Sequence, residues 1–262
     1  STSRGLGDVY KRQILHDLGG GHDGLYREIG LVHVVDDALG DNSGRAVPGR
    51  DGRHGAVLVI GHVVQAGHVD ARQLRSGAEG RPGFSWPKPE RFPTVEELKE
   101  ALRSVAPEKV FFMGGEPTVA KELPELLAFA KQELGAVTRL GHTNGSRLPL
   151  EFLDGANVGF KAWSPELHRR ITGRDKNLIY DNFAAACDAG LEMAANMVYV
   201  PGLVELDEFA GTVQFLSRIS PEIPFHIMGY IPVPGEPYRR PTDAEMEQAE
   251  ALCRTYLRHV AS

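Results

Sequence analysis

From Pro93 onward the sequence alternates helix-like and strand-like segments joined by short connections, and this alternation limits the possible folds more than any other feature. Such a pattern is typical of repeated βα units around a parallel sheet. Thr94 and Glu97 fit a capping box at the first helix. The expected strands cover 109–113, 136–140, 157–162, 191–199 and 223–231, and the expected helices cover 95–102, 119–134, 178–189, 206–217 and 243–260. The sequence therefore predicts an α/β fold.

The segment from Val110 to Thr118 reads Val-Phe-Phe-Met-Gly-Gly-Glu-Pro-Thr. Its apolar start is typical of a strand that is covered on both faces. Gly114 and Gly115 lack a Cβ, so a ligand can approach the backbone closely, and Glu116 offers acceptors to a cationic group. This motif predicts a ligand site. The plain alternative is a strand-to-helix turn with a solvated glutamate.

The first 85 residues differ from the rest of the chain in composition. They hold 17 of the 30 glycines and 6 of the 10 histidines, and they show neither sustained helical periodicity nor a regular strand rhythm. We interpret residues 1–85 as an atypical segment outside the native fold, produced by a wrong reading frame upstream of about Phe84. The alternative is a His-rich metal-binding segment, which the wide spacing of the histidines from His16 to His68 disfavours.

Charge and hydropathy exclude several classes of partner. A net charge of −6 and a pI of about 5.9 disfavour a nucleic-acid partner, because phosphate binding needs a basic face. No apolar run reaches the roughly 18 residues of a membrane span, and the amino terminus lacks a secretory pattern. Two cysteines, Cys187 and Cys253, suit a reducing compartment. We therefore expect a cytoplasmic protein without nucleic-acid or membrane partners.

From Pro93 to about Arg240 the chain resembles the radical S-adenosylmethionine (SAM) enzymes, in particular the branch of the pyruvate formate-lyase activating enzymes. The Gly-Gly-Glu turn at 114–116 matches the SAM-binding turn of this family. Further matching motifs follow in the family's order, namely Thr143-Asn144-Gly145, Val158–Ala162, Glu166–His168, Thr172-Gly173, Val200–Gly202 and Tyr230–Pro232. The resemblance implies a partial (β/α)6 barrel of the TIM type over residues 86–240, whose first strand is missing or replaced, and a C-terminal helix within 241–262.

The resemblance also implies which residues bind the cofactor. Glu116, with the backbone of the two glycines before it, would hold the methionine ammonium of SAM, and Lys161 would hold the carboxylate. Parallel strands of a barrel end at one mouth, so these residues are expected to share a site. The alternative for Lys161 is an ordinary solvent-facing lysine at a strand end, and we favour the functional interpretation. The residues assigned to SAM are Gly114, Gly115, Glu116, Thr143, Asn144, Lys161 and Asn196.

The cluster ligands of the family have no counterpart in this chain. Radical SAM enzymes hold a 4Fe–4S cluster on Cys-x-x-x-Cys-x-x-Cys after the first strand, whereas Cys187 and Cys253 lie downstream and 66 positions apart. Both cysteines fit helices, where they read as small core residues. We therefore assign no metal ligand and no catalytic residue, and we expect the chain as written to be inactive.

The activity implied by the family is reductive cleavage of SAM to a 5′-deoxyadenosyl radical, which abstracts a hydrogen atom from the substrate. A flavodoxin or ferredoxin would supply the electron, and a glycyl-radical enzyme or a peptide would be the substrate. Two alternatives remain open. One is a cluster-free barrel that binds SAM or a nucleotide, and the other is an aldolase-type barrel with Lys161 as the Schiff-base nucleophile.

Three histidines fall near the predicted strand ends. We interpret His168 as a structural residue at the start of a helix. His142 and His226 are expected to be surface or satisfied core histidines unless the fold places them in the barrel mouth.

Overall fold

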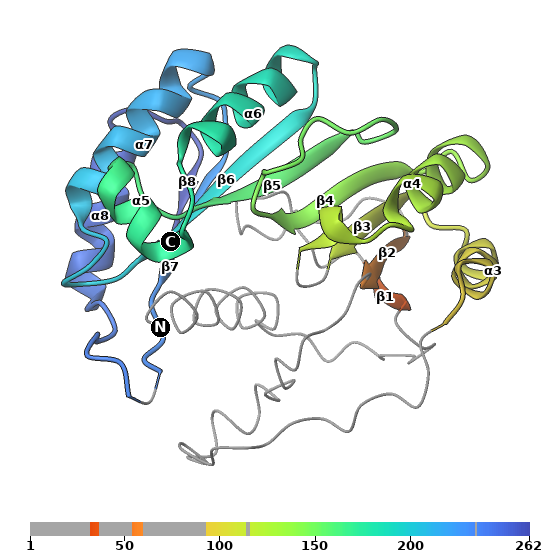
Figure 1. Cartoon of the computed structure of the whole chain (residues 1–262), viewed down its shortest axis with the longest axis horizontal. Helices are drawn as coiled ribbons and strands as arrows, with labels where there is room; N and C mark the ends of the chain where they lie inside the picture. The colour runs from red at the N-terminus through yellow and green to blue at the C-terminus, as the bar shows by residue number, and fades with distance from the viewer. Residues whose placement is uncertain (1–31, 37–53, 60–92, 114–115, 234) are drawn as a thin grey trace.

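The computed structural model describes residues 32–36, 54–59, 93–113, 116–233 and 235–262, the first two ranges by their backbone. In these residues eight strands form one open sheet in chain order (Figure 1). The first pair is antiparallel and every later pair is parallel. The strands are β1 (Val32–Asp36), β2 (His54–Val59), β3 (Lys109–Met113), β4 (Val137–Thr143), β5 (Gly155–Phe160), β6 (Glu192–Tyr199), β7 (Phe225–Gly229) and β8 (Val260–Ala261).

Helices lie along the outer face of the curved sheet and connect the described strands from β3 onward, except β4 and β5, which a loop joins (Figure 1). The predicted capping box is present, because Glu97 N donates to Thr94 Oγ1 and Thr94 N donates to Glu97 Oε2. The helices are α3 (Val95–Val105), the 3-10 helix η1 (Pro117–Val119), α4 (Leu123–Gln132), α5 (Pro165–Thr172), α6 (Asn177–Asp188), α7 (Leu206–Ile219) and α8 (Asp243–Arg254). None of these helices is long and apolar enough to cross a membrane.

The apolar core lies between the sheet and its outer helices. Phe160 of β5, for example, packs against Tyr180 and Phe183 of α6, with ring centroids 4.6 and 5.3 Å apart. Successive strand residues point to opposite faces, so Gly159 and Lys161 turn toward the inner, concave face. The outer face of the sheet therefore supplies stability, and the inner face is left for polar groups.

The predicted α/β fold with a partial barrel is confirmed. Strands β2 to β7 form an open parallel sheet of six strands, and helical structure follows β3, β5, β6 and β7, whereas a loop joins β4 to β5. The first position is taken by β2, which pairs in parallel with β3 and comes from the segment 1–85, where we expected no regular strand. Apart from β1 and β2, that segment lies outside the described residues, and its foreign origin stays a prediction.

Two predicted helices have different bounds. The helix expected over 119–134 begins at Leu123, because Pro124 belongs in a first helical turn, where its missing N–H costs nothing. The helix expected over 243–260 ends at Arg254. Val260–Ala261 instead forms β8 beside β7, where Phe225 N donates to His259 O at 2.8 Å. The C-terminal segment therefore adds a strand as well as a helix.

Candidate functional site

The carboxylate of Glu116 joins residues 116–118, which follow β3, to the end of β4 at the carboxyl end of the sheet. Its Oε1 accepts hydrogen bonds from Thr118 N at 3.2 Å, from Thr118 Oγ1 at 2.7 Å and from Thr143 Oγ1 at 2.7 Å. Its Oε2 accepts from Asn144 N at 2.6 Å. The structure thus brings together Glu116 after β3 and the two polar residues at the end of β4.

Strands β5 and β6 bring Lys161 and Asn196 to the same glycine. Gly159 is the register partner of Asn196. A Cβ on Gly159 would lie 3.1 Å from Lys161 Nζ, 3.3 Å from Asn196 Oδ1 and 3.9 Å from Thr143 O. A side chain at this position would be crowded, so Gly159 lets an ammonium, an amide oxygen and a carbonyl oxygen converge closely on the strand. Thr143 connects these groups to the carboxylate of Glu116.

Lys161 interacts electrostatically with Glu116. Burial lowers the pKa of Lys161 to about 8, and the Glu116 carboxylate opposes this shift by favouring the ammonium. The two residues therefore do not lie on opposite sides of the molecule. Gly114 and Gly115, the remaining residues assigned to SAM, lie outside the described residues.

Asn196 is fully buried and anchors a polar network on the inner face. Its Nδ2 donates to Asn157 Oδ1 at 2.8 Å and lies 3.4 Å from His142 Nδ1. Within the described part of the chain, its Oδ1 is the one buried side-chain nitrogen or oxygen without a hydrogen-bond partner. A buried acceptor of this kind calls for a donor from outside the described residues, such as a water molecule or a ligand. The network therefore points an unsatisfied oxygen at the candidate site.

Two histidines belong to this inner face. His226 is the register partner of Asn196 on β7. Burial lowers the pKa of His142 to about 4, and the positive charges of Lys161 and His226 act in the same direction. His142 and His226 are therefore neither surface residues nor part of the apolar core. His168, by contrast, lies in α5 and its side chain is buried. Its Nδ1 lies 3.0 Å from Arg174 O, in agreement with a structural role.

Sequence analysis missed Glu208 of α7, which fixes the turn after Lys161. Its carboxylate accepts from Trp163 N at 2.5 Å, from Ser164 N at 2.8 Å and from Ser164 Oγ at 2.5 Å. The turn opens α5, and a negative charge is favourable at a helix N-terminus. The partners lie 44 and 45 positions from Glu208, so no local motif could have linked them.

The cysteines lie in the helical layer. Cys187 is partly buried in α6, and Cys253 is fully buried in α8. Burial raises the pKa of Cys187 to about 11 and that of Cys253 to about 12. Among the residues that the structure describes, no three His, Cys, Asp or Glu side chains are grouped so that they could hold a metal ion.

Comparison with known families decides the relationship. Residues 75–216, more than half of the chain, match the radical SAM superfamily. The chain belongs to the radical SAM superfamily. Radical SAM proteins are enzymes that use SAM together with a 4Fe–4S cluster, and the open parallel barrel found here is the radical SAM fold.

The sequence identity between the chain and individual radical SAM proteins is low. A Methanocaldococcus jannaschii protein assigned as a glycyl-radical enzyme activating enzyme is 26% identical over 177 residues, which cover 64% of this chain and 68% of the relative. Crystal structures of Streptococcus suis SuiB, alone and bound to S-adenosylmethionine, match with a TM-score of 0.52 at 18% and 15% identity. Each match covers 64% of this chain, which spans only about two fifths of SuiB (41% and 42%).

Proposed function

We propose that this radical SAM protein binds SAM at the mouth of its open barrel and that it is of the activating-enzyme type. The observation that carries the proposal is the convergence of Lys161, Asn196 and Thr143 at Gly159. The likeness to the M. jannaschii relative supports the activating-enzyme type.

The polar groups at the mouth suit the two charges of an amino acid. Glu116 provides a carboxylate for an ammonium group, and Lys161 provides an ammonium for a carboxylate. Asn196 Oδ1 offers a buried acceptor that lacks a partner in the described residues. SAM carries an amino-acid end, which would bind to these groups. Gly114 and Gly115 would add backbone contacts.

The side chains of the site would orient the ligand before any chemistry. Glu116 is already fixed by donors from three residues, so little conformational freedom is lost when a ligand binds. Lys161 is partly deprotonated near neutral pH, and the ligand carboxylate would stabilise its charged form. When bound, SAM is the source of the hydrogen-abstracting radical in this superfamily.

The residues of this chain do not fit the 4Fe–4S cluster of the superfamily. Such clusters are held by Cys thiolates. Cys187 and Cys253 lie on different helices, and their raised pKa values disfavour the thiolate. The chain as written would therefore bind SAM without cleaving it. In the intact enzyme, the cluster ligands would belong to the sequence that residues 1–85 replace.

The intact enzyme would act on a glycyl-radical enzyme, because the M. jannaschii relative is assigned as an activating enzyme of that class. A peptide is the other substrate that the family resemblance implies. A flavodoxin or ferredoxin would supply the electron. Both cysteines are free, which suits a reducing cytoplasm.

Isothermal titration calorimetry on the full chain tests the proposal at the amino-acid end of the ligand. SAM carries this end, whereas 5′-methylthioadenosine lacks it. We expect SAM to bind about tenfold to a hundredfold more tightly than 5′-methylthioadenosine. This difference in affinity corresponds to the free energy of one or two charge-assisted hydrogen bonds. Lys161→Met removes the ammonium but keeps a side chain of similar length, so it should bring the SAM affinity close to that of 5′-methylthioadenosine.

Lys121→Met is the matched control, because the side chain of Lys121 is 91% exposed. This variant should keep the wild-type preference for SAM. Equal affinity of the wild-type chain for the two compounds would contradict the proposal. A Lys161→Met variant that still prefers SAM would contradict the role of Lys161.

The low pKa of Lys161 favours a second candidate, an aldolase-type barrel. A neutral lysine amine attacks a carbonyl carbon, water leaves, and borohydride reduces the resulting imine to a stable amine. Incubation with pyruvate or acetaldehyde and borohydride, followed by mass spectrometry, tests this candidate. An adduct on Lys161 that the Lys161→Met variant lacks would support it, and its absence would exclude it for these carbonyl compounds.

A further inference from the structure

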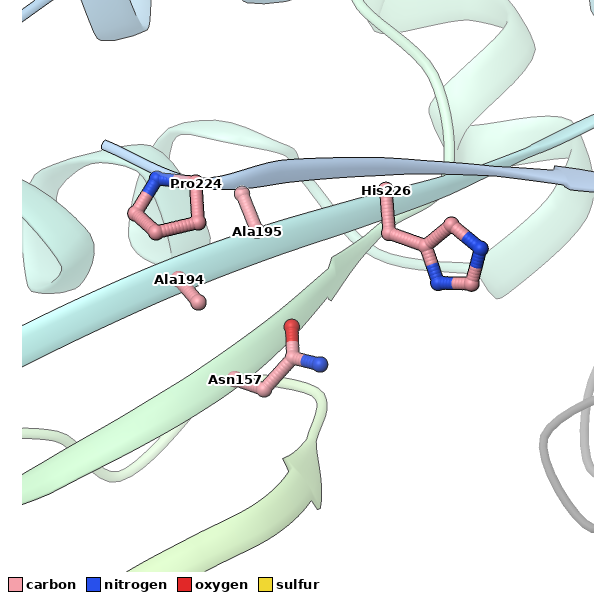
Figure 2. A pocket seen from close by; sticks show the side chains of 5 residues that line it. All are labelled: Asn157, Ala194, Ala195, Pro224 and His226. Carbon is pink, nitrogen blue, oxygen red and sulfur yellow. The ribbon is translucent and has the colours of Figure 1, made fainter. Parts of the chain in front are cut away.

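Cavities adjoin both faces of strand β6, and they differ in size. Figure 2 shows the cavity on the inner face, which is lined by Asn157, Ala194, Ala195, Pro224 and His226. Its volume of about 40 Å³ accommodates only a few water molecules. The other cavity has a volume of about 320 Å³, and small-molecule sites measure roughly 300–1,000 Å³. The larger cavity is therefore the one with room for a ligand.

We call the larger cavity the α6–α7 pocket, because Cys187 of α6 and Ile219 of α7 both line it. Met193, near the amino end of β6, also lines the pocket. Met193 and Asn196 are three residues apart, so their side chains point to opposite faces of the sheet, about 10 Å apart along the strand. The pocket therefore lies on the helical side of the sheet and is separate from the candidate SAM site.

The walls of the α6–α7 pocket are mainly apolar. Four aliphatic side chains contribute to them, namely Leu191, Met193, Ile219 and Ile223. Met193 and Ile223 are buried. Burial and the Asp188 charge raise the pKa of Cys187 to about 11, so its thiol is uncharged near neutral pH. Walls of this kind bind the apolar body of a ligand.

The charge in the pocket is negative. Among the lining residues Asp188 carries a carboxylate, and none of them is Lys, Arg or His. Asp188 is the last residue of α6 and Ile219 is the last residue of α7, so the carboxyl ends of two helices meet here. Each of these ends carries a partial negative charge. Arg218, in the last turn of α7, is exposed and does not line the pocket, which therefore favours a cation.

We propose that the α6–α7 pocket binds a small amphipathic amine, whose apolar body packs against Met193 and Ile223 and whose ammonium group pairs with Asp188. Ser220 also lines the pocket. Its Oγ accepts from Glu222 N at 3.2 Å and has a second lone pair for the ammonium. A neutral ligand of the same shape lacks the attraction to Asp188, and an anion is repelled. This site is independent of SAM binding, because it shares no residue with the candidate SAM site.

Three probes of similar shape and different charge test the ligand class. Phenethylamine, phenethyl alcohol and hydrocinnamate each carry a benzene ring on a short tether, which ends in an ammonium, a hydroxyl or a carboxylate group. Ligand-observed nuclear magnetic resonance on the full chain measures their affinities near neutral pH. We expect phenethylamine to bind about threefold to tenfold more tightly than the alcohol, because Asp188 and the helix ends attract its charge. Hydrocinnamate should bind most weakly.

Cys187 reports where the probe binds. Its side chain lines the pocket and is partly buried, whereas Cys253 is fully buried in α8. Bound phenethylamine should slow the alkylation of Cys187 by iodoacetamide in proportion to its occupancy, which peptide mass spectrometry measures. Cys253 should stay unmodified as long as the chain is folded. Saturating SAM should leave the phenethylamine affinity unchanged, because the two sites are separate.

Two substitutions with matched controls test the residues. Asp188→Asn should remove the preference for phenethylamine over the alcohol, while Asp181→Asn, exposed in the same helix, should retain it. Cys187→Phe fills the pocket and should weaken the binding of phenethylamine and of the alcohol about tenfold or more. Ala185→Phe adds the same ring to an exposed position of α6 and should bind both probes like the wild-type chain. Circular dichroism verifies that each variant is folded.

Each part of the inference has an outcome that overturns it. Equal affinity for phenethylamine and the alcohol, or tighter binding of hydrocinnamate, overturns the cationic class. An Asp188→Asn variant that keeps the preference overturns the pairing with Asp188. Alkylation of Cys187 that bound phenethylamine does not slow, or affinity that Cys187→Phe does not change, overturns the location. If none of the probes binds, the pocket is not a ligand site.

Discussion

At the scale of single residues, Glu116 holds the mouth of the barrel together. Four hydrogen bonds from three residues converge on its carboxylate. Glu116→Gln keeps the size of the side chain but places an NH2 group against donors. We expect a loss of about 1–3 kcal/mol in the free energy of unfolding, because donors are left without acceptors. We also expect SAM affinity to fall about tenfold or more, since the carboxylate that faces the ammonium is lost.

Urea unfolding and calorimetric SAM titration measure these two effects. Glu122→Gln is the control, because Glu122 is partly exposed and makes no capping hydrogen bond to α4. The control should change the free energy of unfolding by less than about 0.5 kcal/mol. Unchanged stability and unchanged SAM affinity in Glu116→Gln would show that the network has no role.

If Lys161 binds the SAM carboxylate as proposed, we expect SAM binding to depend on pH. Only the ammonium form pairs with a carboxylate, and the pKa of Lys161 in the free chain is about 8. Affinity should therefore be highest below pH 8 and fall as the pH rises through that value. Lys161→Arg retains its charge across this range. The variant should lose this part of the pH dependence, while deprotonation of the ligand's own amino group affects both chains equally.

Calorimetric titrations between about pH 7 and about pH 10 provide the measurement. Identical pH profiles of the wild-type chain and Lys161→Arg would mean that Lys161 does not titrate in the site.

At the scale of elements, the position of Lys161 depends on the turn between β5 and α5. Glu208 accepts three hydrogen bonds from Trp163 and Ser164, and Tyr180 OH donates to Ala162 O at 3.1 Å. This turn is therefore fixed from both α6 and α7. Glu208 is therefore a positioning residue, because it acts on Lys161 through this turn.

Glu208→Gln should weaken this attachment, because an amide replaces an oxygen that accepts from backbone N–H groups. We expect a lower melting temperature and a reduced preference for SAM over 5′-methylthioadenosine, about threefold to tenfold. The binding of 5′-methylthioadenosine should stay unchanged. A purely structural role would weaken both ligands equally. Asp207→Asn, one residue earlier in α7 and exposed, is the control and should match the wild-type chain.

Local pattern predicted most elements, because strands and helices differ in the period of their apolar residues. It failed where the decisive contact is distant. Val260 pairs with Phe225, and nothing near Val260 in the sequence announces a strand. His142 lies two residues after the buried Leu140, yet it joins the inner-face network because the β4–β5 register shifts between Leu140 and Thr143. Such a shift reverses the face of a side chain and leaves no mark in the sequence.

The sequence predicted those residues of the candidate site that lie at strand ends and in the turns after them. Glu116, Thr143 and Asn144 follow strands in short motifs, and the structure brings them together. Glu208 and His226 lie in ordinary helical and strand patterns. Their place beside the site follows from the register of β5 to β7 and from the packing of α7, which tertiary structure alone determines.

At the scale of the whole molecule, the sheet contains the first position of a radical SAM barrel. Val59, the last residue of β2, is the register partner of Met113, the last residue of β3. The carboxyl end of β2 therefore reaches the same edge of the sheet as the carboxyl end of β3, from which Glu116 follows three residues later. Between Val59 and Pro93 the sequence contains no cysteine. The architecture for a cluster site is thus present in part, while its thiolates are missing.

A chain of this sequence should take up no 4Fe–4S cluster. After anaerobic treatment with iron and sulfide, we expect neither stoichiometric iron nor the broad visible absorption of a cluster, because Cys187 and Cys253 lie on separate helices with raised pKa values. With dithionite and SAM, the chain should form no 5′-deoxyadenosine, although SAM still binds. The matched positive control is a chain in which residues 1–85 are replaced by the first strand and the Cys-x-x-x-Cys-x-x-Cys loop of a radical SAM relative. This hybrid should gain the cluster and the cleavage reaction. A cluster that forms in the original chain and disappears in the Cys187→Ser, Cys253→Ser double variant would prove that the helical cysteines are ligands after all.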